Sequence, residues 1–283
     1  MTIRNAFMIT VLLAGFLFCS RLPAAEVHIA VAANFTDAMR RIAPLFEQTT
    51  GHTTRISYGS TGKLFSQIDN GAPFDVFLAA DTRRPGMAEA QGLAVPGSGF
   101  IYASGKLMLW SSETDAFDDA ESWLRQAHFR YLAIANPKTA PYGLAARQVL
   151  ERLDIKEGIR SRLVRGDSIA QTFQFVASGN AEAGFVAASQ VRAWRGDTGT
   201  SWEIPPDYYS PINQAATLLK KGRSNPAAQA FLDFLRNDSA RAVIESYGYS
   251  TGQNTEAGVN TATGCHAGAH RPDPWTSTGN PSG

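Results

Sequence analysis

The stretch "VHIAVAANFTDAMRRIAPLFEQTTG", residues 27–51, has the pattern of a buried strand followed within a few residues by an amphipathic helix. At its turn, Ala33 and Asn34 are small or neutral polar, and no acid, base or nucleophile is present. The arrangement recurs in "TRISYGSTGKLFSQIDNG", residues 54–71, where a β-branched and aromatic run leads through the turn 59–62 into a second helical pattern. Two strand-turn-helix units therefore offer uncharged hydroxyl or amide side chains at a helix start.

Strand-like and helix-like segments alternate from Glu26 to about Tyr249, which predicts an α/β fold with mainly parallel sheets. The expected strands cover residues 27–33, 53–59, 75–80, 107–111, 131–136, 161–166, 183–189 and 215–221. The expected helices cover residues 35–48, 62–70, 83–91, 120–126, 143–152, 168–178 and 226–246.

Length and charge limit the class of protein. A chain of 283 residues with 44% hydrophobic content can form one large domain or two ordinary ones around a real core. Its 26 Lys and Arg nearly balance its 25 Asp and Glu, so we expect no nucleic-acid partner and no polybasic membrane surface. Any bound anion must be held by local groups. We expect a monomer.

The N-terminus has the pattern of a secretory signal peptide. Arg4 supplies the positive charge, residues 6–18 form an apolar run, and small residues precede the expected cleavage after Ala24 or Ala25. The apolar run is too short for a membrane-spanning helix, and no later segment is long enough for one. We therefore expect residues 1–25 to be removed and the protein to reach the periplasm.

The two cysteines favour no internal disulfide, because Cys19 would leave with the signal peptide and only Cys265 would remain. A lipoprotein anchored through Cys19 is the alternative, but bulky apolar residues precede it where a small residue is needed. Residues 252–283 are rich in Gly, Thr, Asn and Pro, which predicts a disordered tail. Cys265, His266 and His270 in this tail could suggest a metal site, but they lack a fourth ligand.

Catalytic patterns are missing from the sequence. It contains no G-x-S-x-G elbow, no H-E-x-x-H motif and no spaced set of Cys and His ligands. His28, His52 and His128 do not stand in a context typical of a positioned general base. We therefore predict that the protein is not an enzyme, with an exported hydrolase as the alternative from another class.

The two turns instead favour anion binding. A helix start has backbone N–H groups without intrahelical partners and the positive end of the helix dipole, so it attracts anions without a formal charge. Asn34, Ser60 and Thr61 can add side-chain donors, although each could be only an N-cap. Because parallel strands end at one edge of a sheet, we expect these donors to converge. Lys63, one turn further on, is expected to point to solvent.

Two later helix starts have the same character. In "NPKTAPYGLAARQVL", residues 136–150, a strand ends and Tyr142 enters a helix behind a proline. In the segment after residue 165, Asp167 or Ser168 is the expected N-cap and Ile169 the first helical residue. Four such starts, two in each half of the chain, predict a site between two lobes.

The order of these motifs resembles the periplasmic molybdate-binding proteins of ABC importers. The resemblance is carried by "AVAANFTDAM", "YGSTGKLFSQIDNGAPFDVFLAAD", "NPKTAPYGLAARQVL", "NAEAGFV" and "FLDFLRNDSARAVIESYGY", and it covers about residues 27–250. It implies a two-lobed periplasmic binding protein of type II, with a mainly parallel sheet in each lobe and two hinge crossovers. The implied crossovers lie near residues 102–107 and 209–215. Lobe 1 would be residues 26–103 plus 214–251, and lobe 2 residues 104–213.

The resemblance also implies a function and a ligand site. The protein would capture molybdate, and also tungstate, between its lobes and deliver it to the membrane permease of an ABC importer. No cofactor is implied, and no metal apart from molybdenum held as the oxyanion. The implied ligand positions are Asn34 and Thr61, through side chain and backbone, Ser60, and Tyr142 and Ile169, mainly through backbone N–H groups.

One departure from the family pattern concerns Ala187, where some members place a tyrosine hydroxyl. Asn34 stands where others carry serine, and its longer amide is expected to compensate. Other oxyanions stay as alternatives. Sulfate is smaller than molybdate, and phosphate carries a proton at neutral pH that calls for a buried acceptor. Chelated iron would need Tyr, His or carboxylate ligands, which the turns lack.

Overall fold

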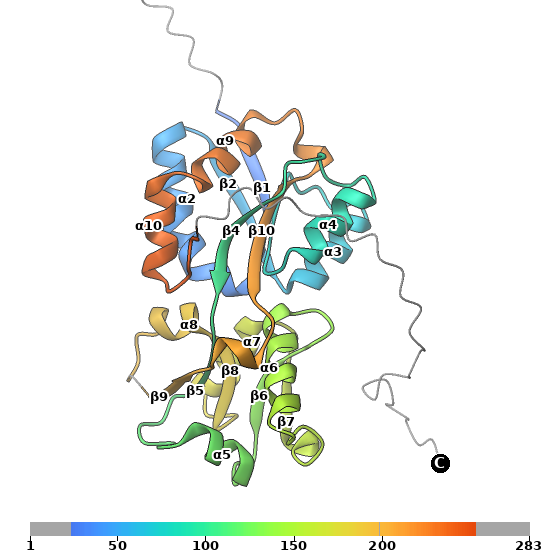
Figure 1. Cartoon of the computed structure of the whole chain (residues 1–283). Coiled ribbons are helices and arrows are strands. Elements are labelled where there is room, and N and C mark those ends of the chain that lie inside the picture. The colour runs from blue at the N-terminus through green and yellow to red at the C-terminus, as the bar shows by residue number, and fades with distance from the viewer. Residues whose placement is uncertain (1–23, 198, 253–283) are drawn as a thin grey trace, which may run out of the picture.

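The computed structural model describes residues 24–197 and 199–252. It contains two five-stranded sheets, each flanked by helices, which lie one beyond the other along the long axis of the molecule (Figure 1). This is the two-lobed α/β architecture expected from the sequence. The expected signal peptide, the expected tail and both cysteines lie outside the described residues, apart from the ends 24–25 and 252. Within the described part, no helix is long and apolar enough to cross a membrane.

The first sheet has four strands in one direction and one against them. β1 pairs in parallel with β2 and β3, whereas β10 is antiparallel to both β3 and β4. The mainly parallel arrangement was predicted from the alternation of strands and helices. The strand order is β2 (Thr53–Gly59), β1 (Glu26–Ala32), β3 (Val76–Ala79), β10 (Ile212–Leu218) and β4 (Phe100–Gly105).

The second sheet repeats this arrangement. β6 pairs in parallel with β7 and β8, and β5 is antiparallel to both β8 and β9. In each sheet the antiparallel strand is therefore the fourth in order. The strand order is β7 (Leu163–Gly166), β6 (Leu132–Ala135), β8 (Ala183–Ala187), β5 (Leu107–Ser111) and β9 (Thr200–Glu203).

Helices cover both faces of each sheet, and the apolar side chains between them form the cores. On the first sheet, one face packs against α2 (Thr36–Thr50), α9 (Pro226–Leu235) and α10 (Asp238–Ser246), and the other against α3 (Thr61–Asp69) and α4 (Arg83–Ala90) (Figure 1). On the second sheet, one face packs against α5 (Ala120–Gln126) and α6 (Pro141–Arg152), and the other against α7 (Ile169–Ala177) and α8 (Ala188–Ala193).

The two sheets are joined by two connections that lie side by side. β4 leads through the single residue Lys106 into β5, and the chain returns from β9 to β10 through residues 204–211, which include the 3₁₀ helix η3 (Pro206–Tyr208). These two connections are held together because β4 and β10 are paired, with Gly105 opposite Ile212. Figure 1 shows both strands running from the first sheet toward the second. The predicted lobe limits, 26–103 plus 214–251 and 104–213, stay a prediction.

The structure differs from the expected elements in three places. The expected helix 226–246 is two helices, because the side chain of Asn237 accepts a hydrogen bond from the Ala240 N–H and starts α10. The expected strand 183–189 ends at Ala187, where α8 begins. β4 and β9 were not expected; each is an edge strand and only partly buried, so its apolar pattern is weak.

Candidate functional site

A small cavity lies where the two sheets meet, and it brings together all five residues singled out in the sequence. Its lining is neutral throughout: Ala32, Ala33, Asn34, Ser60, Thr61, Ala80, Ala140, Pro141, Tyr142 and Ile169. The ends of β1, β2 and β3 and the turns after them contribute the lining residues up to Ala80, and the starts of α6 and α7 contribute the rest. Whether these residues bind a ligand stays a prediction.

The positions of the strand ends explain this convergence. β1 and β2 run in parallel, so the turns that follow them leave the same edge of the first sheet, with Ala32 level with Gly59. The turn after β1 forms the 3₁₀ helix η1 (Ala33–Phe35), and the turn after β2 leads into α3. From the other side, α6 and α7 begin at the cavity, at Pro141 and Ile169. The cavity is thus surrounded by helix starts, whose free N–H groups favour an anion.

Ser60 has an unused hydroxyl in this cavity. It stands at the N-cap position of α3 in an extended conformation, but its side chain makes no capping hydrogen bond. Its Oγ is buried and has no hydrogen-bond partner among the described residues. Ser168, by contrast, caps α7 by accepting from the Gln171 N–H at 3.3 Å. The capping interpretation therefore does not explain Ser60, and a buried unpaired hydroxyl facing a cavity is typical of a ligand contact.

Thr61 has a hydroxyl that is only half satisfied. Its Oγ1 accepts a hydrogen bond from the Ala80 N–H at 3.0 Å. A hydroxyl also carries one donor, and no described residue accepts it. The bond to Ala80 fixes the oxygen, so the hydrogen is available to an acceptor in the cavity.

Asn34 differs from the expectation for its side chain. Its Nδ2 donates to Gln214 Oε1 at 2.8 Å and to the Tyr249 hydroxyl at 3.0 Å, which uses both amide hydrogens. In this arrangement the amide does not serve as a ligand donor and does not compensate for the missing hydroxyl at Ala187. Gln214 and Tyr249 are 180 and 215 residues away from Asn34, so local reasoning from the sequence could not find them.

The Tyr142 phenol lies away from any hydrogen-bond partner. Burial raises the pKa of this phenol well above its usual value, so it is neutral, and its hydroxyl has no partner among the described residues. The hydroxyl lies against Gly105, where a Cβ atom would overlap it. The phenol therefore reaches the connection between the sheets, and the contribution expected from Tyr142 to a ligand remains its backbone N–H at the start of α6.

The two lobes touch directly around the cavity. The Gly62 N–H donates to the Thr139 carbonyl at 2.8 Å, and a Cβ on Gly62 would lie 2.9 Å from the Thr139 Cα, so only glycine fits this approach. Lys63, expected to point to solvent, forms an ion pair with Asp167 of the other lobe at 2.7 Å, although its side chain is 51% exposed. The Arg84 guanidinium donates to the Lys138 carbonyl at 2.9 Å.

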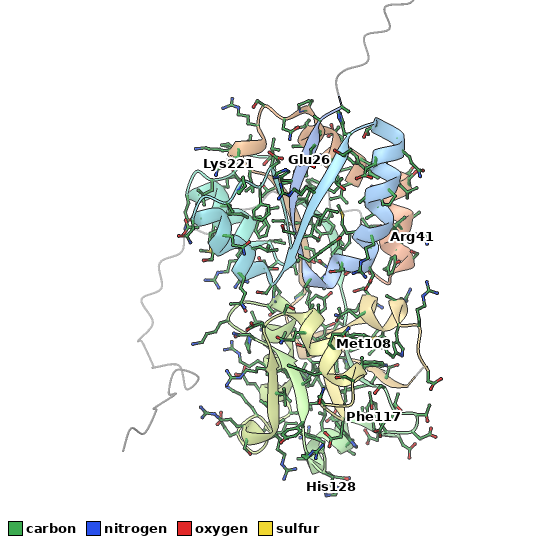
Figure 2. The ribbon with its side chains drawn as sticks, turned by 180° about the vertical axis from the view of Figure 1, so that it is seen from behind. Glu26, Arg41, Met108, Phe117, His128 and Lys221 are labelled. Atoms are coloured by element: carbon green, nitrogen blue, oxygen red, sulfur yellow. The ribbon has the colours of Figure 1, made fainter. Side chains whose placement is uncertain are left out.

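His28 and His128 lie far from the cavity. His28 is hydrogen-bonded to Glu26, which Figure 2 shows at the far end of the first lobe, and the same view shows His128 at the far end of the second. Among residues 24–197 and 199–252, no group of three His, Cys, Asp or Glu side chains could hold a metal ion. The cavity offers donors to an anion but no acidic, basic or imidazole side chain, so its geometry suits binding rather than catalysis.

Comparison with known proteins gives consistent results. The model of the family described as bacterial extracellular solute-binding protein matches residues 27–250. The molybdate-binding protein ModA of Azotobacter vinelandii is 53% identical over 243 residues, which cover 86% of this chain and 96% of that protein. ModA of Rhodobacter capsulatus is 49% identical over 232 residues, covering 81% and 91%. The solved structure of the Azotobacter vinelandii periplasmic molybdate-binding protein aligns with a TM-score of 0.77 and 38% identity, covering 81% of this chain and 100% of that one.

Proposed function

The chain belongs to the family of bacterial extracellular solute-binding proteins, and on that premise we propose that it captures molybdate between its two lobes and delivers it to an ABC importer. Two relatives that cover most of the chain are named as molybdate-binding proteins, and the similar solved structure from Azotobacter vinelandii is described as a periplasmic molybdate-binding protein. We place this protein in the periplasm as well, after removal of the signal peptide. Its role is binding and transport rather than catalysis.

The observation that carries the proposal is the pair of neighbouring hydroxyls with unused donors, Ser60 and Thr61, in a cavity surrounded by helix starts. A tetrahedral dianion loses its hydration shell on entering such a cavity. Neutral N–H and O–H dipoles replace that shell, and they do so without burying a counter-charge of their own. The bonds are charge-assisted, which makes each about 1.5 to 3 kcal/mol favourable.

Binding also requires movement of the lobes. The cavity has a volume of about 10 Å³ in this arrangement, which is room for about one water molecule. An anion with four oxygens is larger, so the helix starts of the two lobes have to separate for it to enter. The paired connections at Gly105 and Ile212 are the place where the lobes can rotate relative to each other.

The spacing of the donors around the bound anion sets the choice of ligand. Molybdate and tungstate are nearly equal in size, so we expect both to bind. Sulfate is smaller and would leave some donors too distant. Protonated phosphate needs a buried acceptor, and the cavity lining offers no carboxylate. The protein needs no cofactor for this role, and we expect it to act as a monomer that docks on the membrane permease and binds no nucleic acid.

Calorimetric titration of the full chain without its signal peptide tests the proposal. Molybdate and tungstate should bind with one site per chain and raise the melting temperature, because a ligand that binds only the folded state stabilises it. Sulfate and phosphate at equal concentration should do little. Equal binding of sulfate and molybdate would overturn the size argument, and hydrolysis of an ester, phosphate or glycoside substrate would favour the alternative class.

A further inference from the structure

A buried group of polar side chains lies beside the cavity, and all its members except Asn34 are outside the expected ligand set. We call it the polar cluster; its members are Asn34, Tyr102, Ser189, Gln214 and Tyr249. All five are at most 5% exposed. The Asn34 amide donates to Gln214 and Tyr249, and the Tyr102 hydroxyl donates to the same Gln214 oxygen at 3.1 Å. The cluster therefore fixes the side chain of the first turn at the cavity.

The carbonyl of Asn34 is the meeting point of two hydroxyls. The Tyr249 hydroxyl lies 2.7 Å from it and the Ser189 hydroxyl 3.0 Å from it. The two hydroxyls lie 2.9 Å from each other. Burial raises the pKa of Tyr249 to about 12, so this phenol keeps its proton at neutral pH.

Ser189 is the member that comes from the other lobe. It lies in α8, which follows β8 of the second sheet, whereas Asn34 follows β1 and Gln214 lies in β10, both of the first sheet. Tyr249 follows α10, which packs on the first sheet. The hydrogen bond from Ser189 to Asn34 thus joins the lobes inside the molecule. It exists only while the lobes are together.

We infer that Ser189, with Tyr249, is a positioning residue that latches the closed arrangement by holding the backbone of the first binding turn. The inference rests on the proposed function, because a latch affects binding only if closure traps a ligand. When the lobes separate, water can replace the Ser189 hydroxyl at the Asn34 carbonyl. Loss of this hydroxyl therefore favours the open arrangement without removing any ligand contact.

The latch predicts a specific change in kinetics. A net hydrogen bond contributes about 0.5 to 1.5 kcal/mol, which corresponds to roughly a 2- to 12-fold change in an equilibrium constant. Ligand release requires opening, so the change should appear in the dissociation rate. In Ser189→Ala, molybdate should dissociate about 2- to 12-fold faster, while its association rate and the melting temperature without ligand stay close to those of the unmodified chain. Tyr249→Phe, which keeps the ring packed against Phe35, should act in the same direction.

The experiment is stopped-flow binding of molybdate to the full chain without its signal peptide, together with small-angle scattering without ligand. Ser178→Ala is the matched control, because among the described residues that hydroxyl bonds only to carbonyls of its own helix, α7, and to Asn180 beside it. Scattering should show a more open average shape for Ser189→Ala than for the control. Unchanged dissociation with an unchanged shape would overturn the latch, as would a lowered melting temperature without ligand and no kinetic change. If the unmodified chain failed to bind molybdate, the proposed function would be refuted, while scattering would still decide the latch.

Discussion

Replacing Ser60 by alanine should improve stability and damage binding at the same time. Ser60 is 4% exposed, and its buried hydroxyl has no hydrogen-bond partner among the residues described. Leaving a buried polar group unpaired costs about 1 to 3 kcal/mol. The free energy of unfolding of the unliganded Ser60→Ala protein should therefore be equal to that of the unmodified chain or higher by about 1 kcal/mol, the lower end of this range. Alanine also keeps the extended conformation that starts α3.

Binding should move in the opposite direction. A hydrogen bond to a charged partner contributes about 1.5 to 3 kcal/mol, so molybdate affinity should fall by roughly 12- to 150-fold. The cost belongs entirely to the complex, because the Ser60 hydroxyl has no hydrogen bond within residues 24–197 and 199–252 that alanine would break. Calorimetric titration measures the affinity, and urea unfolding without ligand measures the stability.

Asn237→Ala is the control for this experiment. Asn237 is a true N-cap of α10 and does not line the cavity, so its loss should cost about 0.5 to 2 kcal/mol of stability and leave affinity unchanged. The reasoning would be refuted if Ser60→Ala behaved like this control, with lower stability and normal molybdate binding. Ser60 would then be an ordinary helix cap.

Three further outcomes are expected. Thr61→Val should lose about 1 to 3 kcal/mol of stability because the buried Ala80 N–H loses its acceptor, and it should also bind molybdate more weakly. Urea unfolding and titration should therefore show lower stability and lower affinity together, unlike Ser60→Ala. Gly62→Ala should weaken molybdate binding by about 1 to 3 kcal/mol because its Cβ meets the Thr139 backbone. The stability of the unliganded protein should change little. Normal affinity in titration would count against the close approach of the lobes. Finally, the pKa of Tyr249 is raised from 10.0 to about 12, so the contribution of its protonated phenol to stability is complete below pH 10 and is lost as the pH rises to about 12. Urea unfolding should show that the free energy of unfolding falls by on the order of 2 kcal/mol across that window. The fall should be smaller in Tyr249→Phe.

Local patterns in the sequence predicted the strand-turn-helix units because each has a strong signal. β1 is an apolar run that ends in a short neutral turn, and α2 has its apolar residues on one face. The break at Asn237 was missed although "NDS" can start a helix, because an apolar pattern continues on both sides of it. β4 and β9 were missed because edge strands bury less of their surface and alternate weakly.

The candidate site was predictable as far as it depends on strand order. Parallel strands end at one edge, so Ser60 and Thr61 were expected near Asn34, and the structure places them around one cavity. The direction of the Asn34 amide was not predictable, because it depends on Gln214 and Tyr249, which are remote in sequence. The same holds for the Lys63 ion pair, whose partner Asp167 lies 104 residues further along the chain.

The position of β10 has a consequence for the order in which the two lobes fold. All strands of the second sheet lie between Leu107 and Glu203, so this sheet can form as soon as that stretch is free to fold. In the first sheet, β10 lies between β3 and β4, so these two strands have no common partner until residue 212 and those after it arrive. We therefore expect the second lobe to fold first although it is encoded later. A chain cut short before Ile212 would expose the unpaired edges of β3 and β4, which are templates for aggregation.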